Sequence, residues 1–362
     1  MNRVSWHIAN NNPRRAGLRY RCLYPMEELK RRHVAAEIFD AAHEAQYQSV
    51  VFDAWSAFPS VASSAVAAGI VPLMRRLKRQ GTHLVIDNCD NPFVRTPNEE
   101  WYLAQERLRE MMRLADTLTS CTPELVELLR TQCTLPERIH IIRDPIEERI
   151  RYPDDNLLKA VFSPTRKLSW IRYLEHAWQV GRDRRQGRTP LVWFGNHGNR
   201  FAEGGMLDLL QLREMLESLD TVSPISLSVI SNHKHKFDAH IRDWTFPTHY
   251  LEWDRITFLA ALRLHRICLI PSSPTEFSLG KSANRPTLAL HHGLNVVCDG
   301  VPSYRELSGF VMIDDWERGL SAYLGDPALC AKHLRAANDF IEQRYLLPAV
   351  AEEWRKVLFQ CA

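Results

Sequence analysis

The sequence predicts an α/β protein built on two doubly wound parallel sheets, and three observations carry this prediction. Short apolar runs of strand length alternate with longer segments of helical periodicity along almost the whole chain, which is typical of βαβ units. The chain has 362 residues, more than one ordinary domain contains. Residues 143–159 interrupt the alternation with two X-Pro pairs and two adjacent aspartates, so we expect the linker between the domains there.

The first half alternates strands and helices as a parallel sheet requires. Apolar runs predict strands at residues 4–9, 36–39, 49–54, 83–87, 117–120 and 139–142. Apolar residues at helical spacing predict helices at 24–30, 64–79, 99–115 and 123–130. Gly81 suits the end of the second of these helices, and Met111 and Met112 belong to the apolar face of the third. We expect residues 1–150 to form the first domain.

The second half repeats the alternation. It predicts strands at residues 191–195, 226–231, 267–271, 295–298 and 310–313. The helices expected between and after them span 207–218, 255–264, 283–292, 315–324, 328–344 and 348–359. Residues 158–344 would form the second domain and 345–362 a terminal helix, which makes a protein of two lobes with a cleft between them.

Composition and charge exclude several classes of protein. The 46 basic and 43 acidic side chains leave a net charge of +3, too small to indicate a partner of nucleic acid. The least polar run, residues 61–74, contains two serines and a proline and is shorter than a membrane span. The eight cysteines show no CxxC spacing, and the first residues contain no secretion signal. We therefore expect a cytoplasmic protein with reduced thiols.

The sharpest local signal is Lys281-Ser-Ala-Asn-Arg-Pro286, between a predicted strand and a predicted helix. Ser282 can cap that helix, and Pro286 suits its first turn. Free N–H groups at the helix start, Lys281 and Arg285 would then converge, an arrangement that binds a phosphate or diphosphate without a metal. A capped helix with two solvated cations explains the same residues.

A second candidate is the turn Phe194-Gly-Asn-His-Gly-Asn-Arg200, directly after a predicted strand. A glycine at this place lets the backbone approach a ligand closely. The turn lacks the GxGxxG pattern of a dinucleotide site, so we expect Gly195 and Asn196 to face a phosphate or a sugar instead.

Other polar clusters are open to more than one interpretation. The basic run at residues 232–236, which contains Lys234, adds charge to the cleft or is a solvated loop. Asp87 and Asp90 serve an acceptor hydroxyl, hold a divalent ion or cap a turn. The chain has no GxSxG, Walker, HExxH or zinc pattern, which disfavours the corresponding hydrolases, NTPases and zinc enzymes.

The order of these elements resembles that of glycosyltransferases with the GT-B fold, specifically the retaining family-4 type. The segments that carry the resemblance in the second half are Leu191-Val-Trp-Phe-Gly195, Arg266-Ile-Cys-Leu-Ile-Pro-Ser-Ser273, Lys281-Ser-Ala-Asn-Arg285, Gly293-Leu-Asn-Val-Val-Cys298 and Pro302-Ser-Tyr-Arg-Glu306. In the first half they are Ser120-Cys-Thr-Pro-Glu124 and Ile139-His-Ile-Ile-Arg-Asp-Pro145. The loop at 281–285 resembles that of a subgroup of surface-polysaccharide transferases.

The resemblance implies two Rossmann-like domains facing a central cleft, with the terminal helix crossing back to the first domain. It also implies transfer of a sugar from a nucleoside-diphosphate-sugar donor to a hydroxyl of a glycan, lipid-linked or small-molecule acceptor, with retention and with no metal or other cofactor. A lipid-linked acceptor would bring the protein to the inner face of the membrane.

The resemblance assigns roles to residues of both lobes. Lys281 and Arg285 would stabilise the leaving diphosphate, and Glu306 would lie near the sugar or ribose. Arg19 and Arg21 would meet the donor or an anionic acceptor from the first lobe. The residues expected to bind the donor are Gly195, Asn196, Lys234, Ser282, Asn284, Ser303 and Tyr304.

One departure from the family leaves alternatives open. The glutamate that usually binds the ribose hydroxyls corresponds to Leu288, which cannot accept a hydrogen bond. Glu306 is a candidate substitute. A nucleotide-sugar-binding pseudoenzyme and a sugar-nucleotide 2-epimerase on the same fold are the alternative functions.

Overall fold

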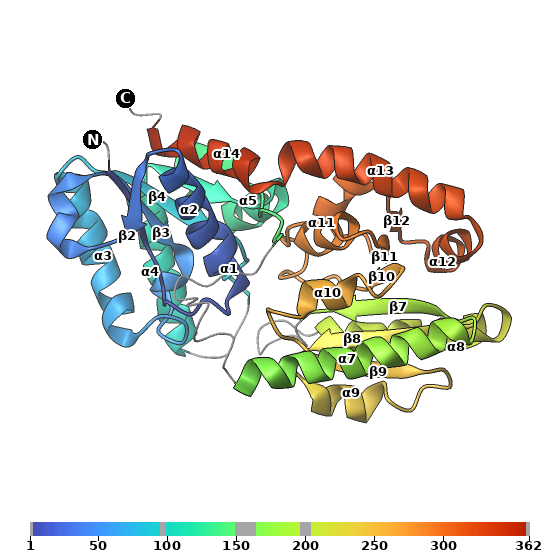
Figure 1. The fold of residues 1–362 in the computed structure, drawn as a ribbon. Coiled ribbons are helices and arrows are strands. Elements are labelled where there is room, and N and C mark those ends of the chain that lie inside the picture. The colour runs from blue at the N-terminus through green and yellow to red at the C-terminus, as the bar shows by residue number, and fades with distance from the viewer. Residues whose placement is uncertain (1–2, 95–98, 149–163, 196–203, 360–362) are drawn as a thin grey trace. The chain divides into compact units, whose positions relative to one another are not determined.

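The computed structural model describes residues 3–94, 99–148, 164–195 and 204–359, with the side chains of residues 164–166 left out. The chain divides into two compact units, each with a parallel six-stranded sheet (Figure 1). Unit 1 comprises Met1–Pro145, Leu279–Ser282 and Gln343–Ala362, and unit 2 comprises Ile146–Ser278 and Ala283–Glu342. Among the described residues, no helix is both long enough and apolar enough to cross a membrane.

In unit 1 the strands lie in the order β2-β1-β3-β4-β5-β6 and every neighbouring pair is parallel. The strands are β1 (Arg3–His7), β2 (Ala35–Ile38), β3 (Tyr47–Asp53), β4 (His83–Asn88), β5 (Thr117–Ser120) and β6 (Arg138–Ile141). The helical segments are α1 (Ala16–Leu18), the π-helical turn η1 (Arg19–Leu23), α2 (Tyr24–Arg31), η2 (Ala41–Gln46), η3 (Ala54–Ala57), α3 (Ser64–Arg79), α4 (Glu99–Leu114), α5 (Pro123–Arg130) and α14 (Leu347–Phe359).

Alternate residues of each strand point to opposite faces of the sheet, and both faces are covered, as is usual for a parallel sheet. Val4, Trp6 and Val85 pack on one side against α2 and α14, where Trp354 is fully buried. Helices α3 and α4 pack against each other and against β4. Thr122 and Ser63 cap α5 and α3 with their hydroxyl groups, as N-cap residues do.

In unit 2 the strands lie in the order β12-β11-β10-β7-β8-β9, again all parallel. The strands are β7 (Thr189–Phe194), β8 (Ile225–Ser231), β9 (Thr248–Glu252), β10 (Ile267–Ile270), β11 (Asn295–Cys298) and β12 (Met312–Ile313). The helical segments are α7 (Pro164–Arg185), η4 (Gly205–Leu212), α8 (Arg213–Val222), α9 (Lys234–His240), α10 (Phe258–Leu262), α11 (Asn284–His291), η5 (Pro302–Leu307), α12 (Trp316–Gly325) and α13 (Pro327–Arg344).

The core of unit 2 lies between this sheet and the segments η4, α8, α9 and α12. Trp193 is the largest fully buried side chain there, and Leu227 and Leu269 from the neighbouring strands belong to the same cluster. Helix α7 packs against β7 and β9, and α11 packs against β10 and β11.

The predicted fold class is confirmed, and several predicted elements differ. Helix α7 and strand β9 were not predicted, and the basic run at 232–236 is a helix start instead of a loop. The helix expected at 207–218 is a 3-10 segment followed by α8, since the chain reaches helical geometry only from Arg213. The helix expected at 255–264 is shorter, because Asp254 forms a turn with the backbone of Ile256.

Each sheet has one point where the order of its strands reverses. In unit 1 the chain continues from β1 to β2 on one side and then to β3 on the other, and in unit 2 β7 and β10 flank the corresponding point. Ligands of open α/β sheets bind beyond the carboxyl ends of the strands at such reversal points. The two reversal points are therefore where the candidate sites are built.

Candidate functional site

The reversal point of unit 2 brings together Gly195, Arg285 and Tyr304, three of the residues that the sequence singled out. Gly195 directly follows β7, with φ of +155°. A Cβ atom at Gly195 would lie 3.3 Å from the Trp193 ring and 3.4 Å from Nη1 of Arg285. Any other residue here would push Trp193 or Arg285 aside by a few tenths of an ångström, so glycine favours the close approach of Arg285 to this turn.

Arg285 is held by a hydroxyl group. It is the second residue of α11 and donates a hydrogen bond to the side chain of Tyr304, which is buried. Burial raises the pKa of Tyr304, while the charge of Arg285 lowers it, so the phenol stays protonated. Arg285 is thus oriented by a neutral partner and keeps its positive charge for a ligand.

The loop after β10 is fixed by two carboxylates. Asp299 accepts a hydrogen bond of 2.7 Å from the backbone N–H of Ser272 and another of 2.7 Å from Nε1 of Trp316. Asp208 accepts a hydrogen bond of 2.5 Å from Oγ of Ser273. These bonds hold the loop in place, so the edge of unit 2 beside Arg285 is preformed.

Lys281 and Ser282 belong to unit 1, and each has a carboxylate partner there. Lys281 forms an ion pair with Asp90. Ser282 donates a hydrogen bond of 2.6 Å to Asp144 and does not cap α11, so the predicted cap is wrong. The N-cap residue of α11 is Ala283, which has no side-chain acceptor.

The expected loop after the first strand is wrong at Arg19 and Arg21, because both lie in the helical segment η1 and are largely buried, but Arg21 lines the cavity described below. Arg21 forms ion pairs with Asp87, at 2.6 Å, and with Asp144, at 3.4 Å. Arg19 donates hydrogen bonds to the carbonyl oxygen atoms of residues 13 and 14. Asp87 is therefore occupied by Arg21 and is not available to hold a divalent ion.

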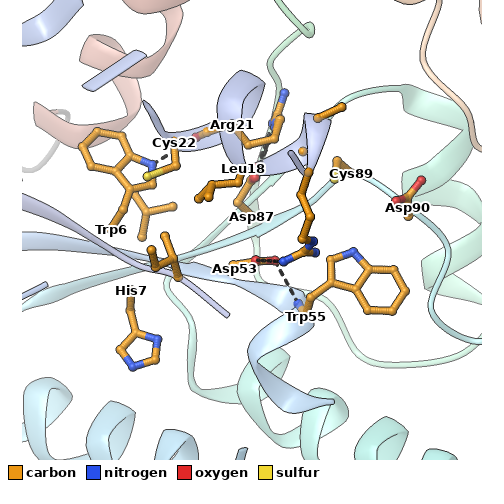
Figure 2. A pocket seen from close by; sticks show the side chains of 15 residues that line it. Trp6, His7, Leu18, Arg21, Cys22, Asp53, Trp55, Asp87, Cys89 and Asp90 are labelled. Atoms are coloured by element: carbon orange, nitrogen blue, oxygen red, sulfur yellow. Dashed lines mark hydrogen bonds and ion pairs between the residues drawn. The ribbon is translucent and has the colours of Figure 1, made fainter. Parts of the chain in front are cut away.

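A cavity of about 270 Å³ lies at the reversal point of unit 1 (Figure 2). Its polar groups include Asp53, Asp90 and Arg15, and Trp55 supplies an aromatic wall. Arg15 lies 3.9 Å from Asp53, whose pKa is raised by burial and lowered in part by the charge of Arg15. Carboxylates that accept hydrogen bonds beside an aromatic ring are suited to a ligand rich in hydroxyl groups.

Histidine in this cavity is neutral. Burial lowers the pKa of His7 to about 4, and its ring stacks on Phe52 with a centroid distance of 5.5 Å. A neutral imidazole adds no charge to the cavity. Its charged lining consists of Asp53, Asp90 and Arg15 together with the ion pair of Arg21 and Asp87.

The remaining predicted residues are placed as follows. Lys234 forms an ion pair of 2.7 Å with Asp238 on the exposed face of α9. Asn284 is the half-buried first residue of α11. In η5, Ser303 is half-buried and Glu306 is exposed. Leu288 is buried in the core, and Asn196 lies outside the described residues. No group of three or more potential metal ligands occurs within the part of the chain that the structure describes.

Sequence reasoning missed Arg15, Asp53 and Trp55. Asp53 ends an apolar strand as Asp87 does, and that position at a carboxyl edge was the available signal. Trp55 and Arg15 lie in segments whose sequence has no periodicity, so their place in the cavity depends on the tertiary fold.

Comparisons with known proteins extend these observations. No family model matches the sequence, and no curated protein matches it. Solved structures do match over the whole chain. Sucrose-phosphate synthase from Thermosynechococcus elongatus is 11% identical, with a TM-score of 0.66, over 100% of this chain and 99% of that chain. The fold is GT-B.

Two further GT-B structures show the same likeness. HepE from Anabaena, in complex with UDP and glucose, is 10% identical with a TM-score of 0.64, over 99% of each chain. WaaG, a glycosyltransferase involved in lipopolysaccharide biosynthesis, is 13% identical with a TM-score of 0.58, over 98% of this chain and 99% of that chain. The predicted GT-B fold with Rossmann-like sheets is confirmed.

Proposed function

We propose that this protein is a glycosyltransferase that moves a sugar from a nucleoside-diphosphate-sugar donor to an acceptor hydroxyl. The observation that carries the proposal is the position of Arg285, which lies against the Gly195 turn at the reversal point of the unit 2 sheet. A delocalised, permanently charged guanidinium beside exposed backbone is suited to a diphosphate.

In the transfer, the bond between the anomeric carbon and the diphosphate oxygen breaks, and the acceptor oxygen bonds to the same carbon after losing its proton. Negative charge grows on the leaving diphosphate. Arg285 stabilises that charge, and Tyr304 keeps the guanidinium in place, so little reorganisation is needed during the reaction. Lys281 adds a second positive charge, Asn284, Ser282 and Ser303 contact the donor, and Glu306 binds the sugar or ribose.

The solved structures support the choice of donor. HepE was crystallised with UDP and glucose, and an Escherichia coli protein with a TM-score of 0.52 was crystallised with UDP-2-fluoro glucose. We further propose that the transfer retains the configuration at the anomeric carbon, as in the family-4 type, and that it requires no metal ion. The acceptor would bind in the cavity of unit 1, where Asp53, Asp90 and Trp55 meet the hydroxyl groups of a glycan, a lipid-linked sugar or a small molecule. The reaction would take place in the cytoplasm or at the inner face of the membrane.

Thermal unfolding in the presence of UDP, GDP, ADP or CMP, with EDTA added, tests the donor site. We expect one nucleoside diphosphate at 100 times its Kd to stabilise the wild type by about 2.7 kcal/mol. Arg285→Gln should remove this stabilisation, because the neutral amide cannot compensate the charge of the diphosphate.

Arg305→Gln is the matched control, since Arg305 is an exposed arginine of the same unit, in η5. It should keep the stabilisation of the wild type. The proposal would be contradicted if no nucleotide stabilised the protein, or if Arg285→Gln and Arg305→Gln responded alike.

A further inference from the structure

Helix α7 presents an apolar face to solvent. Among the large hydrophobic side chains that the structure describes as exposed, half belong to this one helix. Trp178 is 60% exposed and Leu174 is 61% exposed. The exposed apolar residues of α7 are Leu168, Trp170, Ile171, Leu174 and Trp178, which we call the α7 face.

The opposite side of α7 packs against β7 and β9. It buries His176, Val180 and Asp183, of which only valine is apolar. Asp183 accepts a hydrogen bond of 2.6 Å from His249 of β9. The helix therefore turns polar groups inward and its largest apolar groups outward, which is the reverse of an ordinary surface helix. Folding of unit 2 alone does not account for the apolar α7 face.

The charge around the α7 face is positive. Lys167, Arg182 and Arg185 are exposed at helical spacing along it, and Glu175 is the single exposed acidic residue between 167 and 185. Arg182 lies over the Trp178 ring, 5.4 Å from its centroid, and the ring of Tyr173 meets that of Trp170 edge-on. Aromatic rings flanked by cations are typical of helices that lie in the interface of a membrane.

We propose that the α7 face binds the surface of an anionic lipid bilayer, with Trp178, Leu174 and Ile171 inserted between headgroups and Lys167, Arg182 and Arg185 paired with lipid phosphates. Charge complementarity selects this partner. A second copy of the chain docked through the same face would bring these three cations against their own copies, which is unfavourable. The proposal goes beyond glycosyl transfer and does not require it.

Co-sedimentation of the full chain with vesicles tests the proposal. The vesicles contain either phosphatidylcholine alone or phosphatidylcholine mixed with phosphatidylglycerol. We expect the wild type to bind the anionic vesicles and to dissociate as salt is raised. The variant with Trp178→Ala and Leu174→Ser should bind at least ten times more weakly, and Arg182→Gln roughly five times more weakly, because each basic residue contributes about one factor of five.

The matched control is a variant with Tyr102→Ala and Leu103→Ser on α4. These two side chains are 57% and 53% exposed, so the control removes equally exposed apolar surface from unit 1. It should bind vesicles as the wild type does. Circular dichroism verifies that all variants are folded, since exposed side chains contribute little to stability.

Three outcomes would overturn the proposal. The wild type does not bind anionic vesicles, or it binds neutral and anionic vesicles equally, or the α7 and α4 variants bind alike. Light scattering tests for the other possible occupant, a second copy of the chain. If the wild type does not bind vesicles but is a dimer, and the α7 variant is a monomer, the α7 face would be assigned to a second copy.

Discussion

Arg21 and Arg285 both lie at the carboxyl edge of a parallel sheet, but their neighbours differ in charge. Arg21 is enclosed by Asp87 and Asp144, both buried, so its charge is compensated within the protein. The hydrogen-bond partner of Arg285 is the neutral hydroxyl of Tyr304. A sequence cannot distinguish these two arginines by residue type, because the carboxylates that neutralise Arg21 come from positions 66 and 123 residues away.

The charge of Lys281 is neutralised less completely than that of Arg21 and more than that of Arg285. Its amine is paired with Asp90, but its side chain is more than one third exposed. We expect Lys281→Ala to reduce turnover about 100- to 1000-fold with the fold intact, as the loss of one charge-stabilising group does. Turnover is measured as release of the nucleoside diphosphate identified by thermal unfolding.

A double variant separates catalysis from simple pairing. If Lys281 only neutralises Asp90, then adding Asp90→Asn to Lys281→Ala removes the unpaired carboxylate and restores the thermal stabilisation by the nucleoside diphosphate, a measurement made without acceptor. If Lys281 acts on the diphosphate, the nucleoside diphosphate does not stabilise the double variant. Near-normal turnover of Lys281→Ala alone would remove this residue from the catalytic machinery.

At the scale of elements, prediction of helices succeeds where one face is apolar and the other is polar. Helices α3 and α5 have the predicted bounds, and their buried residues recur with the helical period. Strands β5 and β11 also have the predicted bounds, but all of their residues are buried. Helix α7 was missed for the opposite reason. Its buried face contains His176 and Asp183, and its exposed face contains Trp178 and Leu174, so its apolar residues lie on the side away from the sheet. Local pattern cannot reveal a face whose partner lies outside the fold.

The polar underside of α7 makes unit 2 sensitive to acid. Burial lowers the pKa of His176 to about 3, and that of His265, whose ring lies 5.7 Å away, also to about 3. Unfolded histidine titrates near 6.5, so between these values the unfolded chain binds more protons than the native one. Stability therefore falls as pH drops from 6.5 towards 3. The ring of His249, which is hydrogen-bonded to Asp183, lies 6.3 Å from that of His176.

We expect His176→Leu to flatten this dependence. Going from about pH 7.5 to about pH 4.5, the wild type should lose roughly 2–3 kcal/mol more of the free energy of unfolding than the variant. Urea unfolding followed by circular dichroism measures the difference. His235→Leu, at an exposed histidine of the same unit, is the control. Equal losses in wild type and His176→Leu would show that this histidine is not responsible.

At the scale of the whole molecule, unit 1 is assembled from three separate stretches of chain. The candidate site depends on this. Leu279–Ser282 supplies Lys281 and Ser282 to Asp90 and Asp144, and Gly280 accepts a hydrogen bond of 3.1 Å from Thr122. The sequence placed both residues at the start of α11 but could not show that they belong to unit 1, since that depends on contacts across about 140–190 residues.

The third stretch completes the core of unit 1. Trp354 of α14 is fully buried, and its ring lies 5.8 Å from that of Trp6 in β1. We expect a chain ending at Glu342 to lose the folded state of unit 1. Without the side chains of α14, one apolar face of β1 and β3 is exposed to solvent. Limited proteolysis measures this as rapid cleavage within residues 3–145.

Trp354→Ala is a milder version of the same change and should lower the free energy of unfolding by about 3–5 kcal/mol. A peptide of residues 343–362 added to the shortened chain should restore part of the protection. Protection of the shortened chain equal to that of the wild type would contradict the role given to α14.

The division of unit 1 into three stretches also sets an order of events during synthesis. Residues 1–145 leave the ribosome before α14, the helix that covers their sheet, and unit 2 is made in between. At typical rates of translation, the delay is on the order of tens of seconds. Unit 2 can thus fold before unit 1 is complete. During this delay the apolar face of β1 and β3 is open to solvent or to a chaperone. Unit 1, whose sheet is made before unit 2, is therefore completed after it.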